Sequence, residues 1–363
     1  MDDAHIFELT LNNFRNYSGK KFAFSGDINI IVGNNGAGKT NILEALSLFS
    51  NSNGLRNAPK DELTNVNRNC PFLPPNILYS ILISFSSGEK ISVTQEKERK
   101  IIKINGEIVR RASVLNDFLN ITFLAPHMDN FFMENSSVRR KFLDKTAEIM
   151  FREHYENVKK YEFFVKERMK ILTEQKWDDN WLNIVEKKIV SLGVGIAETR
   201  NEVVELLNRI FSSFTENFPT GNLEIVGEIE NLLGPKKSME VEKFFLERLR
   251  DGRMDDARNK RTALGAHRSD IVALHAGKKM RADLCSTGEQ KMLLVSLILA
   301  RCIFSKLHGA GLPVLLLDEA CSHLDEEARL KLFQELRNIS VQTFITGIKR
   351  EDFTNLGGNI IEL

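Results

Sequence analysis

The chain has 363 residues, which is long enough for two or three compact domains with full-sized hydrophobic cores. Hydrophobic residues make up 42% of it and charged residues 27%, a balance typical of a soluble globular protein. The formal net charge of +1 excludes a uniformly basic surface, so any surface for nucleic acid must be local.

Several features of the sequence predict a cytoplasmic protein. There is no run of 18 apolar residues, so we expect no membrane partner. The first twenty residues contain three acidic residues, which excludes a secretory signal. The cysteines form no C-x-x-C pair and no histidine cluster has metal-ligand spacing, which favours free thiols in a reducing compartment. These cysteines are Cys70, Cys285, Cys302 and Cys321.

The N-terminal third is predicted to be rich in β-strands. Asn105-Gly106 is a strong signal for a tight hairpin turn. The segment 51–75 is rich in Asn and Pro and is predicted to be a loop. Apolar runs and alternating patterns predict strands at His5–Leu11, Asp27–Val32, Asn76–Phe85, Ile91–Thr94 and Ile101–Ile104.

A glycine-rich segment follows the second of these strands. An apolar strand at 28–32 precedes it, and a helix with an apolar stripe is predicted at 40–49. A glycine-rich turn without function is the alternative, but both flanks are those of a phosphate-binding loop. The segment fits G-x-x-x-x-G-K-[ST] at every position and reads Gly33-Asn34-Asn35-Gly36-Ala37-Gly38-Lys39-Thr40.

Each residue type in this loop suits a nucleoside triphosphate. Glycines let backbone N–H groups turn toward phosphates, and the N-terminus of the next helix adds partial positive charge. Lys39 is predicted to bridge the β- and γ-phosphate oxygens and to act in catalysis, and the Thr40 hydroxyl to bind Mg²⁺. We therefore expect ATP and Mg²⁺ as cofactors, with the residues from Gly33 to Asn41 contacting the nucleotide.

The middle of the chain is predicted to be helical. From Ser136 to Leu192 there is no Gly or Pro, and apolar residues recur with helical spacing. Further helices are predicted at Ala197–Phe218 and Val241–Arg250. Charges of alternating sign are typical of solvated helix faces, and no heptad pattern persists as a long coiled coil requires.

From Thr262 the pattern returns to alternating helices and strands. Neither α/β segment is large enough to bury its strands alone, so we expect the two ends of the chain to share one sheet. The predicted bounds are 1–122 and 302–363 for this ATPase lobe, and 123–301 for a second, mainly helical lobe. The predicted elements are helices Ser286–Arg301 and Glu326–Asn338 and strands Val314–Leu317 and Thr343–Thr346.

The strand at 314–317 is followed by two carboxylates, Asp318 and Glu319. Beside the phosphate loop, Asp318 is predicted to hold Mg²⁺, largely through water, and Glu319 to polarise the attacking water. A helix cap or a solvated turn is the alternative for such a pair alone. The phosphate loop elsewhere in the chain favours the catalytic interpretation.

A small-residue segment opens the helix predicted at 286–301. Ser286-Thr287-Gly288-Glu289 has the S-x-x-E spacing of a capping box. Small residues also leave the N–H groups of a helix start exposed, which makes a second anion site. One chain cannot easily bring both anion sites to one phosphate, but two chains arranged head to tail can. We favour nucleotide binding by Ser286 and Gly288, and a role in helix capping alone is the alternative interpretation.

These motifs, in this order, resemble those of the ATP-binding-cassette ATPases of the chromosome-maintenance and repair type, and among them the RecF family. The resemblance implies an α/β fold with an ABC-type phosphate-loop ATPase head, a helical second lobe and no long coiled coil. Besides the ATPase motifs, it rests on Leu11–Tyr17, Ile104–Gly106, Val109–Arg111, Val138–Asp144 and Gly265–Asp270.

The resemblance also implies an ATP-sandwich homodimer. Ser286 and Gly288 of one copy are expected to contact the γ-phosphate held by Lys39 of the other. Asp325 is expected at the dimer seam. Arg15 stands where related ATPases place a basic residue near the phosphates, and an arginine at the edge of the core is the alternative.

Three positions depart from the family pattern. Thr287 stands where RecF chains usually have Gln, no Gln follows Phe123 at the lobe junction, and no His follows Thr346 as a γ-phosphate switch. His127 or Asp129 is the candidate to replace the junction Gln. These departures predict slow hydrolysis, that of a weak, DNA-stimulated ATPase.

The resemblance, rather than the composition, suggests DNA as a partner, whether single-stranded, duplex or gapped. Basic clusters exist, each by itself more typical of a solvated face, and across a dimer they could line a groove. They lie at 20–21, 110–111, 139–141, 258–261 and 278–281. Mediators of the RecR and RecO type are further implied partners.

The resulting hypothesis is an ATP-bound dimer that clamps DNA and helps load the RecA recombinase at gaps in repair, replication and the SOS response. A nucleotide-sensing scaffold that docks repair proteins without hydrolysis is the alternative, because the switch His is missing. A membrane-transporter subunit is disfavoured, since it predicts a Gln at the lobe junction and a short helical insert.

Overall fold

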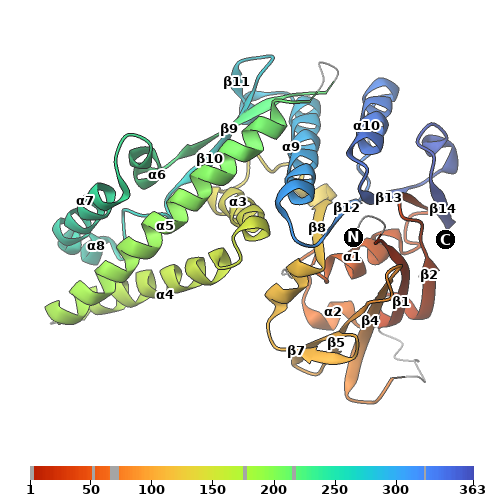
Figure 1. The fold of residues 1–363 in the computed structure, drawn as a ribbon, viewed down its shortest axis with the longest axis horizontal. Helices are drawn as coiled ribbons and strands as arrows, with labels where there is room; N and C mark the ends of the chain where they lie inside the picture. The colour runs from red at the N-terminus through yellow and green to blue at the C-terminus, as the bar shows by residue number, and fades with distance from the viewer. Residues whose placement is uncertain (1–3, 51–53, 66–72, 175–177, 215–217, 323) are drawn as a thin grey trace. The chain divides into compact units, whose positions relative to one another are not determined.

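The computed structural model describes residues 4–50, 54–65, 73–174, 178–214, 218–322 and 324–363 (Figure 1). They form two compact units, one made of 1–129 with 301–363 and the other of 130–300. The boundaries predicted from the sequence, after 122 and after 301, are close to these but not identical. Within the described residues, no helix has both the length and the apolar character needed to cross a lipid bilayer.

A parallel sheet of five strands forms the centre of the first unit. All of its neighbouring strands pair in parallel, in the order β14-β3-β13-β12-β8. Both ends of the chain contribute to it, which confirms the shared sheet predicted from the sequence. Its strands are β3 (Ile28–Val32), β8 (Leu119–Leu124), β12 (Leu312–Leu317), β13 (Gln342–Gly347) and β14 (Asn359–Glu362).

A six-stranded antiparallel sheet completes the strands of this unit, in the order β2-β1-β4-β5-β6-β7. The β6–β7 turn has positive φ at Asn105 (50°) and Gly106 (90°), the conformation of a type I′ hairpin, which confirms the predicted turn. The strands are β1 (Ile6–Phe14), β2 (Tyr17–Ala23), β4 (Ile77–Phe85), β5 (Lys90–Glu96), β6 (Arg99–Ile104) and β7 (Glu107–Val109).

Helix α1 (Lys39–Ser47) packs into the core that the two sheets share (Figure 1). Ile42 of α1, Ile81 of β4 and Leu316 of β12 are fully buried in one apolar cluster. This burial fixes the direction of α1, so its N-terminus faces the carboxyl ends of the parallel strands, where α/β proteins bind ligands. The unit also contains α2 (Lys60–Leu63), α10 (Glu326–Ile339) and the end of α9 (Thr287–His308).

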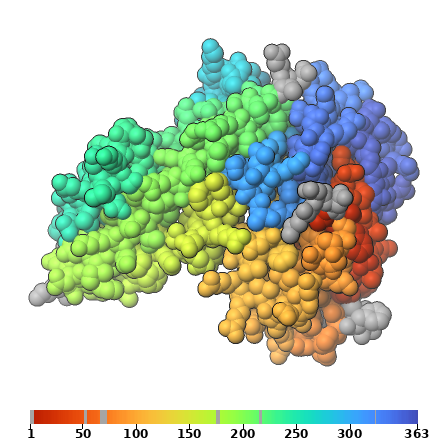
Figure 2. All heavy atoms as spheres, in the orientation of Figure 1, coloured from red at the N-terminus to blue at the C-terminus, as the bar shows by residue number. Residues whose placement is uncertain are grey.

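The second unit is mainly helical, with a three-stranded antiparallel sheet in the order β11-β10-β9. Helix α5 packs against α4 and against α7, and Figures 1 and 2 show these helices in the same part of the unit. The apolar cluster that they enclose includes Tyr161, Ile189 and Phe245. Its elements are α3 (Ser136–Met150), α4 (His154–Leu172), α5 (Asp179–Phe211), β9 (Gly221–Val226), α6 (Glu228–Leu233), α7 (Ser238–Asp251), α8 (Arg253–Asn259), β10 (Asp270–His275) and β11 (Met280–Arg281).

The helix break predicted between Leu192 and Ala197 is wrong. Helix α5 continues through Gly193 and Gly195 and ends at Phe211 rather than Phe218. A Cβ at position 193 would lie 2.9 Å from a ring carbon of Phe245 and 3.0 Å from one of Tyr161. The glycine therefore lets two aromatic rings approach the helix and does not end it. Strands β9 and β10 were not predicted from the sequence.

Candidate functional site

The phosphate loop connects β3 to α1, as its motif predicts. Gly36 and Gly38 have positive φ, 83° and 107°. At Gly38 a Cβ would lie 2.6 Å from both the Asn16 amide nitrogen and the Tyr17 hydroxyl, so no larger residue fits there. The loop ends at the N-terminus of α1, where Asn41 and Ile42 donate the first helical hydrogen bonds to the Gly38 carbonyl, so the N–H groups of Lys39 and Thr40 have no helical partner.

Lys39 lies across this loop and is only 5% exposed. Its Nζ donates to the carbonyl oxygens of Gly33 (2.7 Å) and Asn34 (2.9 Å). An ammonium has three donors, so the same group can bond anionic oxygens placed over the loop. Gly33 and Asn34 therefore act on the site through the backbone that positions Lys39.

The predicted metal residues, Thr40 and Asp318, come together although they are 278 positions apart in the sequence. The Thr40 hydroxyl donates to Asp318 Oδ1 at 3.0 Å, and the Thr346 hydroxyl donates to the same oxygen at 2.9 Å. Asp318 is 4% exposed, and this burial raises the pKa of its carboxyl. Hydroxyl and carboxylate oxygens are the donors that Mg²⁺ prefers, so the set fits that ion.

Thr346 was missed as a site residue. Strand β13 lies between β3, which leads into the phosphate loop, and β12, which leads into Asp318, so its last residues adjoin both halves of the site. The Thr346 hydroxyl also accepts the backbone N–H of Glu319 at 2.9 Å. Glu319 has a φ of 51°, an uncommon backbone conformation for a residue with a side chain. One hydroxyl thus bonds both carboxylate residues.

A pocket of about 220 Å³ lies over the loop. The exposed side chain of Glu319 reaches it, as does Arg56, a cation that the sequence analysis did not identify. Neither His127 nor Asp129, the candidates for the junction Gln, is among the described residues that line it. Those residues are Asn35, Gly36, Gly38, Lys39, Thr40, Asn41, Arg56 and Glu319.

Residues after β1 hold the loop from the side. Asn16 donates to the Ala37 carbonyl at 3.3 Å and accepts from the Asn41 amide at 2.8 Å. Arg15 points elsewhere, because its guanidinium pairs with Glu44 at 2.7 and 2.8 Å and donates to the Glu62 carbonyl at 2.9 Å. This arrangement favours the interpretation of Arg15 as an arginine at the edge of the core.

Ser286 and Gly288 belong to the second unit, and both are exposed at the start of α9. The Ser286 N–H donates to Glu289 Oε2 at 3.0 Å, which confirms the capping contact. Lys278 pairs with Glu289 Oε1 at 2.5 Å, and this bond lowers the pKa of the Glu289 carboxyl to about 2. Capping leaves the two small residues themselves accessible.

The remaining predicted positions have local roles. Asp325 caps α10 by accepting the Ala328 N–H at 2.8 Å. Cys285 and Cys302 are buried free thiols, and Cys321 is a partly exposed free thiol. Cys70 and His323 lie outside the described residues.

Comparison with known proteins gives consistent results. Residues 5–361 match the family described as RecF/RecN/SMC N-terminal domain. "DNA replication and repair protein RecF" of Rhizobium johnstonii is 36% identical over 97% of this chain and 94% of its own length. The protein of the same name in Rickettsia conorii is 35% identical over 98% of this chain and 97% of its own.

Solved structures agree on the fold. The structure of "the recombination mediator protein RecF-ATP in RecFOR pathway" has a TM-score of 0.83 at 23% identity, and the match covers 99% of this chain and 97% of that chain. An Smc head domain from Pyrococcus furiosus has a TM-score of 0.56 at 18% identity, and the match covers 99% of this chain and 93% of that chain. The fold is thus that of an ABC-type ATPase head, and the chain belongs to the RecF family.

Proposed function

We propose that this chain binds ATP with Mg²⁺, dimerises around the nucleotide, and as a dimer holds DNA and helps load the RecA recombinase at gaps. The observation that carries the proposal is the contact between the Thr40 hydroxyl and the Asp318 carboxylate beside Lys39. Relatives named for DNA replication and repair, similar over nearly their full length, support the biological role. We place this activity in the cytoplasm.

The residues of the first unit have distinct roles in this proposal. The loop N–H groups from Gly36 to Asn41 bind phosphate oxygens, and Lys39 bridges the β- and γ-phosphates. Thr40 and Asp318 hold Mg²⁺, which when bound neutralises charge on those phosphates. Glu319, whose side chain reaches the pocket, orients and polarises a water molecule.

Ser286 and Gly288 complete the site of a second copy in this proposal. Their exposure at the start of α9 leaves the Ser286 hydroxyl and the Gly288 N–H accessible to a γ-phosphate presented by another chain, while the Ser286 N–H caps the helix through Glu289. Asp325 lies at the dimer interface in the same arrangement. The lobes that dimerise are 1–122 with 302–363, and 123–301 carries the segment offered to the partner.

DNA is bound in the proposal by exposed basic residues, and RecR- and RecO-type mediators are the protein partners. Lys20, Lys21, Arg111 and Lys278 are exposed. Arg139 is excluded from this surface, because it pairs with Asp270 at 2.8 and 2.6 Å and is 14% exposed. The basic cluster at 139–141 therefore contributes less to DNA binding than the sequence indicates.

Sizing the protein by light scattering tests the dimer. With ATP and Mg²⁺ we expect the mass to double, and we expect duplex or gapped DNA to be retained only by the dimer. Lys39→Ala abolishes both effects by removing the phosphate cation, and Ser286→Arg abolishes them by blocking the second copy. A Ser286→Arg protein that still dimerises would contradict the shared site.

A nucleotide-sensing scaffold without hydrolysis is the second candidate. The observation in its favour is the end of β13, where Thr346 is followed by Gly347 and no imidazole. Glu319→Gln separates the two candidates. A hydrolysing protein traps a long-lived ATP dimer when Glu319 is changed, whereas a sensor keeps the dimer lifetime of the wild type.

A further inference from the structure

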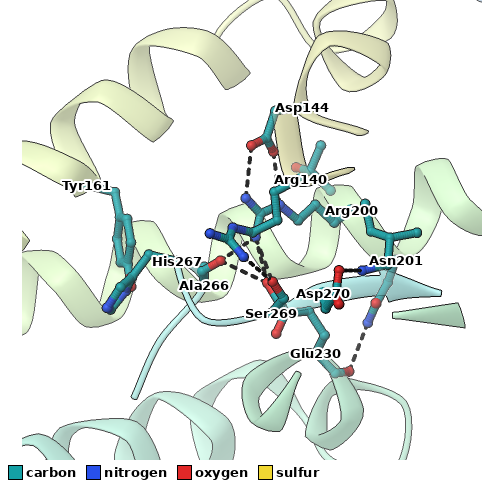
Figure 3. A network of polar contacts seen from close by, with 12 residues as sticks. Arg140, Asp144, Tyr161, Arg200, Asn201, Glu230, Ala266, His267, Ser269 and Asp270 are labelled. Atoms are coloured by element: carbon teal, nitrogen blue, oxygen red, sulfur yellow. Dashed lines mark hydrogen bonds and ion pairs between the residues drawn. The ribbon is translucent and has the colours of Figure 1, made fainter. Parts of the chain in front are cut away.

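Two of the segments that carry the family resemblance, Val138–Asp144 and Gly265–Asp270, meet within the second unit. Neither contributes a residue to the nucleotide pocket. Together with α4 and α5 they line a separate pocket of about 90 Å³. Its polar walls include Arg140, Asp144 and Arg200, which Figure 3 shows pointing toward one another.

Arg200 has a structural role in this pocket. It is 4% exposed and pairs with both oxygens of Asp144 at 2.9 Å. Its remaining nitrogen donates to the Ala266 carbonyl and to the Ser269 hydroxyl (Figure 3). His154 also contacts Asp144 at 2.9 Å. The Asp144 carboxylate is therefore fully engaged, and Arg200, whose Nη1 also contacts Glu230 Oε1 at 3.4 Å, has no nitrogen left for a ligand.

Arg140 differs, because it is half-buried in the same pocket and no carboxylate oxygen of the described residues accepts from it. Its Nη1 donates to the Ser136 hydroxyl at 2.9 Å and to the Ser269 carbonyl at 2.5 Å, both neutral acceptors. Among the described residues, none accepts from its Nε or Nη2. Burial, and after it the neighbouring Arg200, lowers the pKa of Arg140, whereas Asp270 and Asp144 act in the opposite direction.

The charges around the pocket balance. Arg140, Arg200 and the exposed Lys141 face Asp144 and Glu162 in its lining, and Glu230, which pairs with Arg200 at 3.4 Å, is a third carboxylate. An anion would therefore bind through the unused donors of Arg140 rather than through an excess of positive charge. His267 adds no charge at neutral pH, because burial lowers its pKa to about 4. Its Nδ1 bonds the Tyr161 hydroxyl at 2.8 Å and its Nε2 bonds the Thr262 carbonyl at 3.1 Å.

We propose that this pocket is a second anion site, distinct from the nucleotide site, that binds a phosphate-type oxyanion through Nε and Nη2 of Arg140. The planar fork of a guanidinium matches two oxygens of such an anion. The volume of about 90 Å³ is well above the roughly 10–15 Å³ that one water molecule needs, so the pocket has room for a single tetrahedral group. Ser137 and Lys141 add a hydroxyl and an ammonium at the exposed mouth.

Thermal unfolding with inorganic phosphate tests the site, with chloride of equal ionic strength as reference. The phosphate loop also takes phosphate, so the Lys39→Ala protein is the background for all measurements. At ten times the dissociation constant we expect a saturable rise of about 3 °C in the midpoint of the second unit. Arg140→Gln should abolish the rise, and Arg258→Gln, which removes an exposed arginine of the same unit, should leave it unchanged.

Lys141→Gln is the second variant, in case Arg140→Gln does not fold. The Lys141 side chain is exposed, so this change should lower phosphate affinity about threefold without affecting folding. The absence of a saturable shift in the Lys39→Ala background overturns the proposal. So does an equal shift with acetate, which would identify a site for a carboxylate of a protein partner.

Duplex DNA distinguishes the natural sources of the phosphate. If the source is the DNA backbone, free phosphate at constant ionic strength competes with duplex binding by wild type and not by Arg140→Gln. If duplex affinity is independent of Arg140 while the phosphate shift persists, the site serves a small phosphorylated compound. Both outcomes support the anion site, and neither depends on whether ATP drives dimerisation.

Discussion

Asp318 in the first unit and Asp144 in the second are largely buried carboxylates, yet their surroundings shift their pKa values in opposite directions. Asp318 accepts two neutral hydroxyls, and burial raises its pKa. Asp144 is paired with Arg200 and His154, which lower its pKa to about 2 against the effect of burial. Among the described residues the Asp318 carboxylate forms no ion pair, whereas the Asp144 carboxylate is paired with Arg200.

This difference indicates a ligand-binding role for Asp318 and a structural role for Asp144. A buried carboxylate that contacts only hydroxyls destabilises the folded protein when ionised, and a bound cation can offset that cost. The negative charge of a carboxylate paired with an arginine is already compensated. The Asp144–Arg200 pair therefore links α3 to α5 and needs no ligand. The environment of the carboxylate therefore indicates its role better than the residue type does.

Removing Arg200 should give the largest effect. Arg200→Met leaves Asp144 and Glu230 buried without their common cation, which should lower the free energy of unfolding by about 3–5 kcal/mol. Urea unfolding followed by tryptophan fluorescence measures it, because Trp181 lies on α5 of the same unit. The matched control is Arg209→Met on α5, whose exposed pair with Glu205 contributes at most about 1 kcal/mol. Similar losses in both variants would contradict the structural role.

Neutralising Asp318 should act in the opposite sense on stability. Asp318→Asn should weaken Mg²⁺-dependent ATP affinity about 100-fold, or ~2.7 kcal/mol, by removing the charged metal ligand. Without ligand, the variant should be as stable as wild type or slightly more stable, because the native state no longer holds a buried carboxylate with a raised pKa. Calorimetric titration and urea unfolding give the two numbers. A clear loss of stability without ligand would show that Asp318 is structural.

Acid should weaken the second unit through Asp144. The folded pKa is about 2 against an ordinary 3.8, so ionised Asp144 stabilises the protein above pH 4 and this contribution is lost as the pH falls toward 2. The loss should be about 2 kcal/mol, from 1.36 kcal/mol per pKa unit. Urea unfolding at pH 5 and pH 2.5 measures it. Because pH 2.5 still lies above the folded pKa, the loss is incomplete there, so in Asp144→Asn the difference between the two pH values should shrink by about 1.5 kcal/mol. An unchanged difference would refute the assignment.

Much of the nucleotide site could be predicted because its chemistry is local in sequence. Lys39 and Thr40 belong to one eight-residue motif, and Asp318 ends an apolar strand. The sequence motifs alone do not show that these residues lie close together, because that depends on the fold. The small size of the two α/β segments did predict the shared sheet that brings them together. The strands β9 and β10 escaped prediction because both are only partly buried, unlike the fully buried β3, and polar residues interrupt or flank their short apolar stretches.

The charged residues of the second unit could not be assigned in the same way. Arg139 and Arg140 look like a solvated or DNA-binding cluster, yet their partners Asp270 and Ser269 lie 131 and 129 positions away. Nothing local marks a basic residue as paired rather than free. Arg56 and Thr346 were missed for a related reason, since each reaches the site from a segment with no motif of its own.

Thr346 gives the smallest and most specific prediction. Its hydroxyl donates to Asp318 and accepts the N–H of Glu319, so it should position both carboxylates without touching the nucleotide. Thr346→Val keeps the shape of the side chain and removes both bonds. We expect single-turnover hydrolysis to fall about tenfold, ~1.4 kcal/mol, with ATP affinity changed less than about threefold. Thr346→Ser, which keeps the hydroxyl, should restore the rate and acts as the matched control. An equal loss in both variants would assign the effect to packing of β13, and an equal loss of affinity and rate in Thr346→Val would place Thr346 in nucleotide binding instead.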